Sequence, residues 1–278
     1  MGFLERIKGV VSNTKTNKQI GIKKPYFGAG FSSNALKRTY LPIDTYQPAA
    51  VVQAQALTPQ TYGIATPIVT SDDRLAIEEP IKFIEKYCTS EVLNNAIRIN
   101  PAIRQILAEN KLPLTYNLEN LNSLKTAHLA PCAKVAQNIY VNMGHKKDSQ
   151  NFVYLTQAAL LHDIGKAFIP AEILNKRGLL TPSERKIIEL HNRLSYEVLK
   201  TTGLNPKVAQ LAYEHHNYDG KLVKTHENQA LTIADVYCAL REKRPYKKPI
   251  SDLGAKAILY DMGVNNKLDT RFINCIKL

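Results

Sequence analysis

The sequence predicts an all-α fold, and three observations lead to it. From Asp72 onward, apolar residues recur at helical spacing. Several of these segments begin with a helix-capping signal, such as Thr181-Pro182 followed by Glu184. The 278-residue chain is 44% hydrophobic, which is enough for a core, yet no apolar run approaches the ~20 residues of a membrane span. We therefore expect a helical bundle with an N-terminal extension and a small helical region.

Residues 1–72 form the expected extension. They are basic, have little periodicity and are punctuated by prolines, which is typical of an arm or linker. Within them, residues 1–12 place their apolar side chains on one helical face. Two interpretations of this face stay open: an amphipathic helix that touches a membrane or a partner, or a docked or frayed terminus.

Residues 73–118 form the expected small helical region. The apolar spacing predicts helices over about 73–88, 90–98 and 101–110, the last with Pro101 in its first turn. We interpret this region as a small helical unit that caps the segment that follows.

Residues 119–278 hold the residues with functional potential. A helix is predicted over 119–144, and an apolar run beginning at Ala158 ends in the pair His162-Asp163. The Thr181 cap starts a helix that extends to about Lys200, and Asn205-Pro206 caps the next helix. A last helix of this group is predicted over about 227–242.

Five of the seven histidines lie on the apolar faces of these helices, together with two aspartates. A single histidine in such a place is usually a core residue, but five with two carboxylates make a nitrogen and oxygen set suited to two divalent ions such as Fe, Mn or Zn. The set is His128, His162, Asp163, His191, His215, His216 and Asp235. We interpret the other two histidines as structural: His145 as a cation at a helix C-terminus and His226 as a loop residue.

The order of these residues, H…HDIGK…H…HH…D, resembles that of the HD superfamily of metal-dependent phosphohydrolases. The run 174–184 and the sequence Arg244-Pro-Tyr-Lys247 resemble its HD-GYP branch, the cyclic di-GMP phosphodiesterases. The resemblance covers residues 119–278 and implies an HD-domain helical bundle with two metal ions. It implies one ion held by His128, His162, Asp163 and Asp235, with Asp163 bridging to a second held by His191, His215 and His216.

The resemblance also implies a reaction. A hydroxide activated by the two ions would attack phosphorus in line, so that Asp163 and Lys166 become the expected catalytic residues. Lys166, Arg244 and Lys247 are the expected substrate-binding residues. Lys166 is placed to neutralise the phosphoryl oxygens or to help the leaving group, and Arg244 and Lys247 match the family's phosphate contacts. The alternative for Arg244 and Lys247 is surface charge within a basic run.

The sequence departs from the family pattern in its ion number and its nucleotide loop. Leu124 stands where some members have a third-metal glutamate, so we expect two ions and not three. Asn217 replaces a glutamate after the double histidine, Asp219-Gly220 is kept, and the Gly-Tyr-Pro loop is missing. Cys238 stands where members commonly have aspartate. These changes leave the metal set intact and alter the substrate pocket.

Three functions stay open on the sequence: a phosphodiesterase of a cyclic dinucleotide, an HD hydrolase of another phosphorylated nucleotide, and a non-catalytic signalling module that binds nucleotide or protein. The net charge of +13 favours an anionic partner, or else serves solubility. The four cysteines form no CxxC pair, so we expect core thiols and a reducing compartment. The expected location of the protein is therefore the cytoplasm, and attachment to the surface of a membrane is the alternative. The sequence does not specify an oligomeric state.

Overall fold

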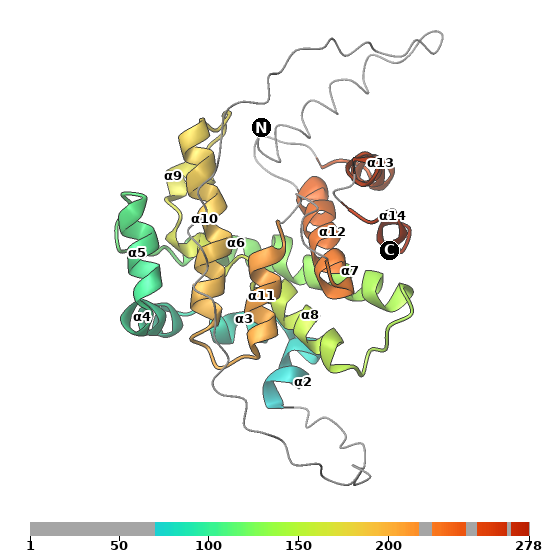
Figure 1. Cartoon of the computed structure of the whole chain (residues 1–278), viewed down its shortest axis with the longest axis horizontal. Helices are drawn as coiled ribbons and strands as arrows, with labels where there is room; N and C mark the ends of the chain where they lie inside the picture. Colours follow the sequence, from blue (N-terminus) through green and yellow to red (C-terminus); the bar gives the residue numbers. More distant parts are fainter. Residues whose placement is uncertain (1–69, 217–223, 243–248, 266–267, 278) are drawn as a thin grey trace, which may run out of the picture. The chain divides into compact units, whose positions relative to one another are not determined.

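The computed structural model describes residues 70–216, 224–242, 249–265 and 268–277, which are coloured in Figure 1. The predicted arm over residues 1–72, including the apolar face of residues 1–12, lies almost entirely outside the described residues. Three expected features of the substrate pocket, namely Asn217, Asp219-Gly220 and the pair Arg244 and Lys247, also lie outside them.

All regular structure in the described part of the chain is helical, which confirms the predicted fold class. The helices, labelled as in Figure 1, are α2 Ser71–Glu78, α3 Pro80–Tyr87, α4 Ser90–Ile99, α5 Pro101–Glu109, α6 Glu119–Leu124, α7 Ala130–Asn142, α8 Gln150–Leu161, α9 Ala171–Leu174, α10 Pro182–Leu199, α11 Pro206–Glu214, α12 His226–Arg241, α13 Asp252–Val264 and α14 Thr270–Ile273. Two short helices of other types, η1 Lys125–Leu129 and η2 Ile164–Phe168, lie between them.

The single helix predicted over 73–88 is wrong, because the structure divides it into α2 and α3 at Glu79. Pro80 occupies the first turn of α3, and Glu79 has φ −132° and ψ 64°, outside the helical region. A proline disfavours the helical conformation in the residue before it and lacks the N–H that would continue the preceding helix. The two helices that follow, α4 and α5, agree with the prediction.

Helices α2 to α5 pack directly on the helices that follow them. Helices α2 and α3 contact α8, while α4 and α5 contact α10. Phe83, Ile84, Leu93 and Ile103 are completely buried in these contacts. Asn100 adds a polar link, because its Nδ2 donates to the Glu197 carboxylate at 2.8 Å. The expected boundary at residue 118 stays a prediction.

The centre of the bundle is formed by α7, α8, α11 and α12, which lie side by side in Figure 1. Helix α8 is buried along nearly its whole length, and α12 along most of it. Their apolar side chains, such as Leu160, Leu161, Leu231 and Leu240, have no exposed surface. Since α8 ends at Leu161, this buried helix delivers the His162-Asp163 pair that follows it into the interior.

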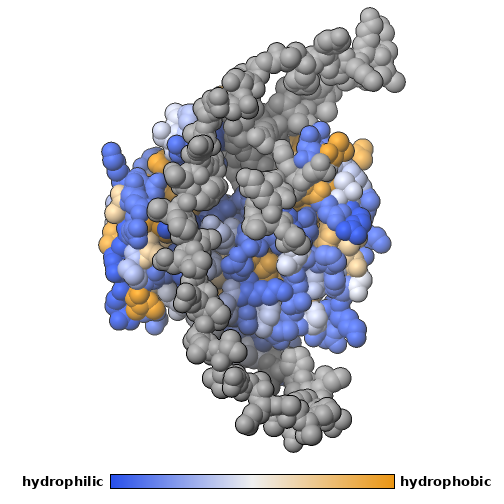
Figure 2. Space-filling model, in the orientation of Figure 1, coloured by the Kyte–Doolittle hydropathy of each residue, from blue (hydrophilic) through white to orange (hydrophobic). Residues whose placement is uncertain are grey.

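The described residues that can be seen in Figure 2 are mostly hydrophilic, with small apolar patches between them. Among the described residues, no helix combines the length and the apolar character that crossing a membrane requires. The prediction of core thiols holds for Cys88, Cys132 and Cys238, which are buried, whereas Cys275 is partly exposed.

Candidate metal centre

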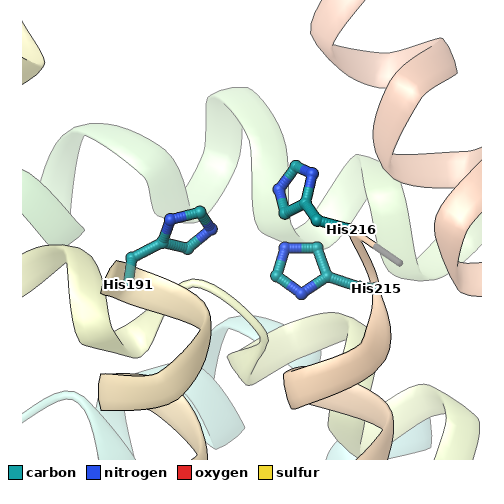
Figure 3. Close-up of side chains that lie close together, drawn as sticks. All are labelled: His191, His215 and His216. Atoms are coloured by element: carbon teal, nitrogen blue, oxygen red, sulfur yellow. The ribbon is translucent and has the colours of Figure 1, made fainter. Parts of the chain in front are cut away.

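The structure brings all seven sequence-predicted metal residues to one place in the bundle. His128 lies in η1, His162 and Asp163 end α8, His191 lies in α10, His215 and His216 end α11, and Asp235 lies in α12. All of them are buried except His216, whose side chain is 26% exposed. Figure 3 shows His191 facing His215 and His216 across the space between α10 and the end of α11. The site therefore opens to solvent beside His216.

His128 lies in a widened helical turn rather than in the regular α-helix predicted over 119–144. Residues Lys125–Leu129 form a π-helix, in which the N–H of Ala130 donates to the carbonyl of Lys125. Pro131 follows in the first turn of α7 and has no N–H to donate to Ala127, so the regular α pattern fails here. Wide turns of this kind occur inside helices, often at functional sites, and the prediction overlooked Pro131 as their cause.

Asp163 stands between two groups of histidines. Its Oδ2 lies 3.4 Å from His162 Nε2 and 3.7 Å from His128 Nε2. Its Oδ1 lies 3.3 Å from His191 Nε2 and 4.0 Å from His215 Nε2. One carboxylate therefore presents a different oxygen to each group, as a bridging ligand must.

Asp235 faces the same space from α12. Its Oδ1 lies 3.0 Å from His128 Nε2 and 3.7 Å from His162 Nε2. Its Oδ2 lies 3.7 Å from His216 Nε2. The second aspartate thus lines the same site from α12.

Backbone carbonyls fix the ring orientation of three histidines. Nδ1 of His162 lies 2.9 Å from the Ala159 oxygen, that of His191 2.5 Å from Ile188, and that of His215 2.6 Å from Ala212. A carbonyl oxygen can only accept, so each Nδ1 carries a proton and each Nε2 of a neutral ring presents its lone pair to the centre. This arrangement is the usual second layer of a histidine–metal site.

The buried polar atoms of this centre fit metal ions. The atoms without a hydrogen-bond partner among the described residues are both ring nitrogens of His128, Nε2 of His162, His191 and His215, and Oδ1 of Asp163. Leaving such atoms buried and unpaired is costly. Ligand atoms of His191, His215 and His216 lie within 4.8 Å of one another, as do those of His128, His162 and Asp163. These two groups could each hold a divalent cation.

The pKa values of the buried histidines in the centre shift in different directions. Burial alone would lower the pKa of His162, but the carboxylates of Asp163 and Asp235 outweigh it and raise this pKa to about 10. Burial lowers the pKa of His191 to about 3 despite the Asp163 charge, and it lowers that of His215 well below its usual value. The latter two rings are therefore neutral at physiological pH, as ligands must be.

Lys166 reaches the centre from η2. Its Nζ donates to Asp163 Oδ2 at 2.5 Å, and its side chain is 15% exposed, so the ammonium lies at the opening. Burial would raise the pKa of Asp163, but the charges of Lys166 and His162 hold it well below its usual value. A cation in this place can contact a phosphoryl group that enters from solvent.

Two residues that the sequence analysis did not identify hold η2 in place. Nδ2 of Asn120 donates to the carbonyls of Lys166 and Ile169, at 3.0 and 2.9 Å. Oγ of Ser195 accepts the N–H of Gly165 at 2.9 Å. A Cβ at Gly165 would lie 2.3 Å from the His191 carbonyl oxygen, so only glycine allows this approach to α10. These contacts join distant segments and leave no local sequence signal.

The interpretations of the remaining two histidines are corrected by the structure. His226 is the first residue of α12 and not a loop residue. His145 follows α7, but its ring stacks on Tyr140, and its Nε2 lies 2.7 Å from His226 Nδ1. Burial and the neighbouring His226 lower the pKa of His145, which disfavours the expected cation.

Comparison with known proteins gives a consistent result. Residues 103–272 match the HD domain family. The chain is 33% identical over 148 residues to the cyclic di-GMP phosphodiesterase response regulator RpfG of Xanthomonas campestris, covering 49% of this chain and 38% of that protein. It is 28% identical over 199 residues to the 3'3'-cGAMP-specific phosphodiesterase 1 of Vibrio cholerae, covering 66% of this chain and 46% of that protein.

A third relative, a cyclic di-GMP phosphodiesterase of Thermotoga maritima, is 35% identical over 113 residues, which are 35% of this chain and 30% of that protein. The chain thus matches less than half the length of each of these relatives. The family match itself covers well over half of the chain. The protein therefore belongs to the HD domain family, whose members are metal-dependent.

Proposed function

We propose that this protein is a metal-dependent phosphodiesterase that hydrolyses a cyclic dinucleotide of the cyclic di-GMP type. One observation carries the proposal: the two oxygens of Asp163 face two separate histidine groups, 3.4 Å from His162 and 3.3 Å from His191. A dinuclear centre needs such a shared carboxylate, and dinuclear centres are a common solution for cleaving phosphate esters. The printed names of the relatives, which are phosphodiesterases of cyclic dinucleotides, support the substrate class.

Each residue has a defined part in this proposal. His128, His162 and Asp235 hold one divalent ion (Fe, Mn or Zn), His191, His215 and His216 hold the other, and Asp163 bridges them. Ions so placed supply Lewis acidity toward the phosphoryl group and lower the pKa of water to about 7. The carbonyls of Ala159, Ile188 and Ala212 keep three imidazoles in the required tautomer.

Lys166 acts on the substrate rather than on the ions. Its ammonium, held 2.5 Å from Asp163, neutralises charge on the phosphoryl oxygens or on the leaving oxygen. Arg244 and Lys247 bind the phosphate that does not react. Since a full set of ligand-type residues converges here, a catalytic protein is favoured over a non-catalytic signalling module, which would have no need to keep every one of them.

A second candidate, hydrolysis of another phosphorylated nucleotide, is favoured by one observation: the Gly-Tyr-Pro loop that contacts the base in the related branch is missing after His216. Base contacts are worth ~1–3 kcal/mol each when a buried partner is left unpaired, so their loss lowers selectivity by about 5- to 150-fold. We therefore expect weaker discrimination among cyclic di-GMP, cyclic GMP-AMP and cyclic di-AMP than in loop-bearing relatives.

The test is a substrate screen on protein purified without oxygen and loaded with Mn²⁺ or Fe²⁺. The three cyclic dinucleotides and bis(p-nitrophenyl) phosphate are offered to the wild type, to Arg244→Ala, and to Glu189→Ala, a control at an exposed position of α10. We expect turnover of all of them. Arg244→Ala should lower the turnover of the three cyclic dinucleotides alike and spare bis(p-nitrophenyl) phosphate, which has no second phosphate, while Glu189→Ala should leave every turnover unchanged. No turnover of any ester by the loaded wild type would overturn the proposal. Sharp guanine selectivity, lost on changing Tyr218 or Lys221, would show that the shortened loop still reads the base.

A further inference from the structure

One histidine of the centre has no main-chain partner for its outer nitrogen. In His162, His191 and His215, a carbonyl oxygen three residues earlier lies at 2.5–2.9 Å from Nδ1. His128 makes no such contact: neither of its ring nitrogens has a hydrogen-bond partner among the described residues. The backbone therefore does not select which nitrogen of His128 faces the centre.

The π turn explains why His128 differs. The carbonyl three residues before it belongs to Lys125, and this oxygen accepts the N–H of Ala130, which closes the widened turn. The geometry that brings His128 to the centre thus engages the carbonyl whose counterparts orient the rings of His162, His191 and His215. An imidazole that is to coordinate through Nε2 needs a different acceptor for its Nδ1–H.

Glu242 is placed to be that acceptor. Its Oε2 lies 4.0 Å from His128 Nδ1, while Asp235 Oδ1 lies 3.0 Å from His128 Nε2. The two carboxylates are seven residues apart, two turns along α12, and thus lie on one face. The His128 side chain is 2% exposed and that of Glu242 is 11% exposed, so their approach is shielded from water. Glu242 caps the end of α12, where its N–H donates to Cys238 at 2.8 Å.

We propose that Glu242 is the positioning residue of His128, and that its carboxylate accepts the Nδ1–H when the ring coordinates an ion through Nε2. A side-chain rotation that shortens the separation by about 1 Å makes the hydrogen bond. The contact fixes the tautomer and makes Nε2 a stronger donor, a role that carboxylates have in many histidine–metal sites. Glu242 itself touches neither the reacting atoms nor the ion. The inference rests on the metal-holding role given to His128 in the proposed function.

The experiment measures ion binding, independently of turnover. The full chain is stripped of metal and titrated with Co²⁺ against a competing chelator, and the visible absorption reports coordination. Glu242→Ala removes the acceptor, whereas Glu242→Gln keeps an oxygen of the same reach without the charge. Glu189→Ala removes an exposed carboxylate from α10 and is the matched control. Thermal unfolding of the metal-free proteins shows whether each variant folds.

We expect Glu242→Ala to weaken the binding of one Co²⁺ by about 10- to 100-fold and to leave the other unchanged. Glu242→Gln should show a smaller loss, and Glu189→Ala none. Unchanged affinities in both Glu242 variants would overturn the inference, as would equal loss of both ions in the Gln variant. Three ions in the wild type and two in Glu242→Ala would make Glu242 a ligand and also overturn it. If the expected shift occurs but no phosphodiester is cleaved, the inference stands and the proposed function fails.

Discussion

The ammonium of Lys166 lies 2.5 Å from Asp163 Oδ2, the carboxylate oxygen that faces His128 and His162. The two residues are three apart in the chain, at the junction of α8 and η2, so their pairing is set locally. The lysine therefore balances the charge of the central carboxylate. A substrate phosphate that enters the centre offers this ammonium a second anionic partner.

Replacing Asp163 with alanine should remove both ions together, because its two oxygens serve the two histidine groups. Metal content per chain, measured after dialysis, is expected to fall from two to near zero, and turnover should disappear with it. Glu189→Ala, which removes an exposed carboxylate of α10, should keep both ions. Full metal content in Asp163→Ala would show that this carboxylate does not bridge.

Replacing Lys166 with alanine should separate metal binding from catalysis. The histidines and aspartates stay in place, so metal content should be kept, while loss of the cation at the opening should lower kcat by about 10²–10³-fold. Lys166→Arg, which keeps the charge, should recover part of the rate. Comparable kcat values for wild type and Lys166→Ala on every ester would exclude a role for the ammonium in the reaction.

The pair His145 and His226 should make stability depend on pH. Burial and His226 lower the pKa of folded His145, so below the ordinary value of 6.5 the unfolded chain binds more protons than the folded one. This contribution to the free energy of unfolding is complete above pH 6.5 and is lost as the pH falls toward the lowered pKa. Urea unfolding at pH 7.5 and 5.0, with chelator present, should show a smaller loss for His145→Gln than for the wild type. An equal loss in both proteins would contradict the prediction.

Adding one methyl group at Gly165 should destabilise the protein. The Cβ of Gly165→Ala would meet the His191 carbonyl at 2.3 Å and the Ser195 backbone nitrogen at 2.5 Å, so η2 must move away from α10. Overpacking of this kind costs about 1–3 kcal/mol of unfolding free energy. Gly178→Ala is the control, because nothing lies within 4 Å of its added Cβ. Equal melting temperatures for the two variants would show that η2 can move away from α10 with no loss of stability.

Much of the fold follows from short-range signals in the sequence. The capping box of Thr181 and Glu184 and the cap of Asn205 start α10 and α11 where they were expected. The errors arose at prolines. Pro80 divides one predicted helix, and Pro131 widens another, because each removes a backbone donor that the apolar spacing does not register.

The composition of the centre was also accessible from the sequence, because its seven residues have recognisable types and order. The contacts that hold these seven residues in position could not be predicted from the sequence. The links from Asn120 to the Lys166 carbonyl and from Gly165 to Ser195 join segments 46 and 30 residues apart. The position of Glu242 beside His128 likewise depends on how α12 packs against the π turn, which no local pattern encodes.

The widened turn at Lys125–Leu129 holds one residue more than a regular helical turn of the same rise. Deletion of Leu129, the residue of this turn that lies between His128 and α7, would therefore shift His128 by one helical position and leave the apolar face of α7 in register with α12. His128 would then be rotated by about 100° around the helix axis, away from Asp163 and Asp235. The scaffold would persist while one of the proposed metal ligands was withdrawn, so a single amino acid separates the complete set of seven residues from an incomplete one.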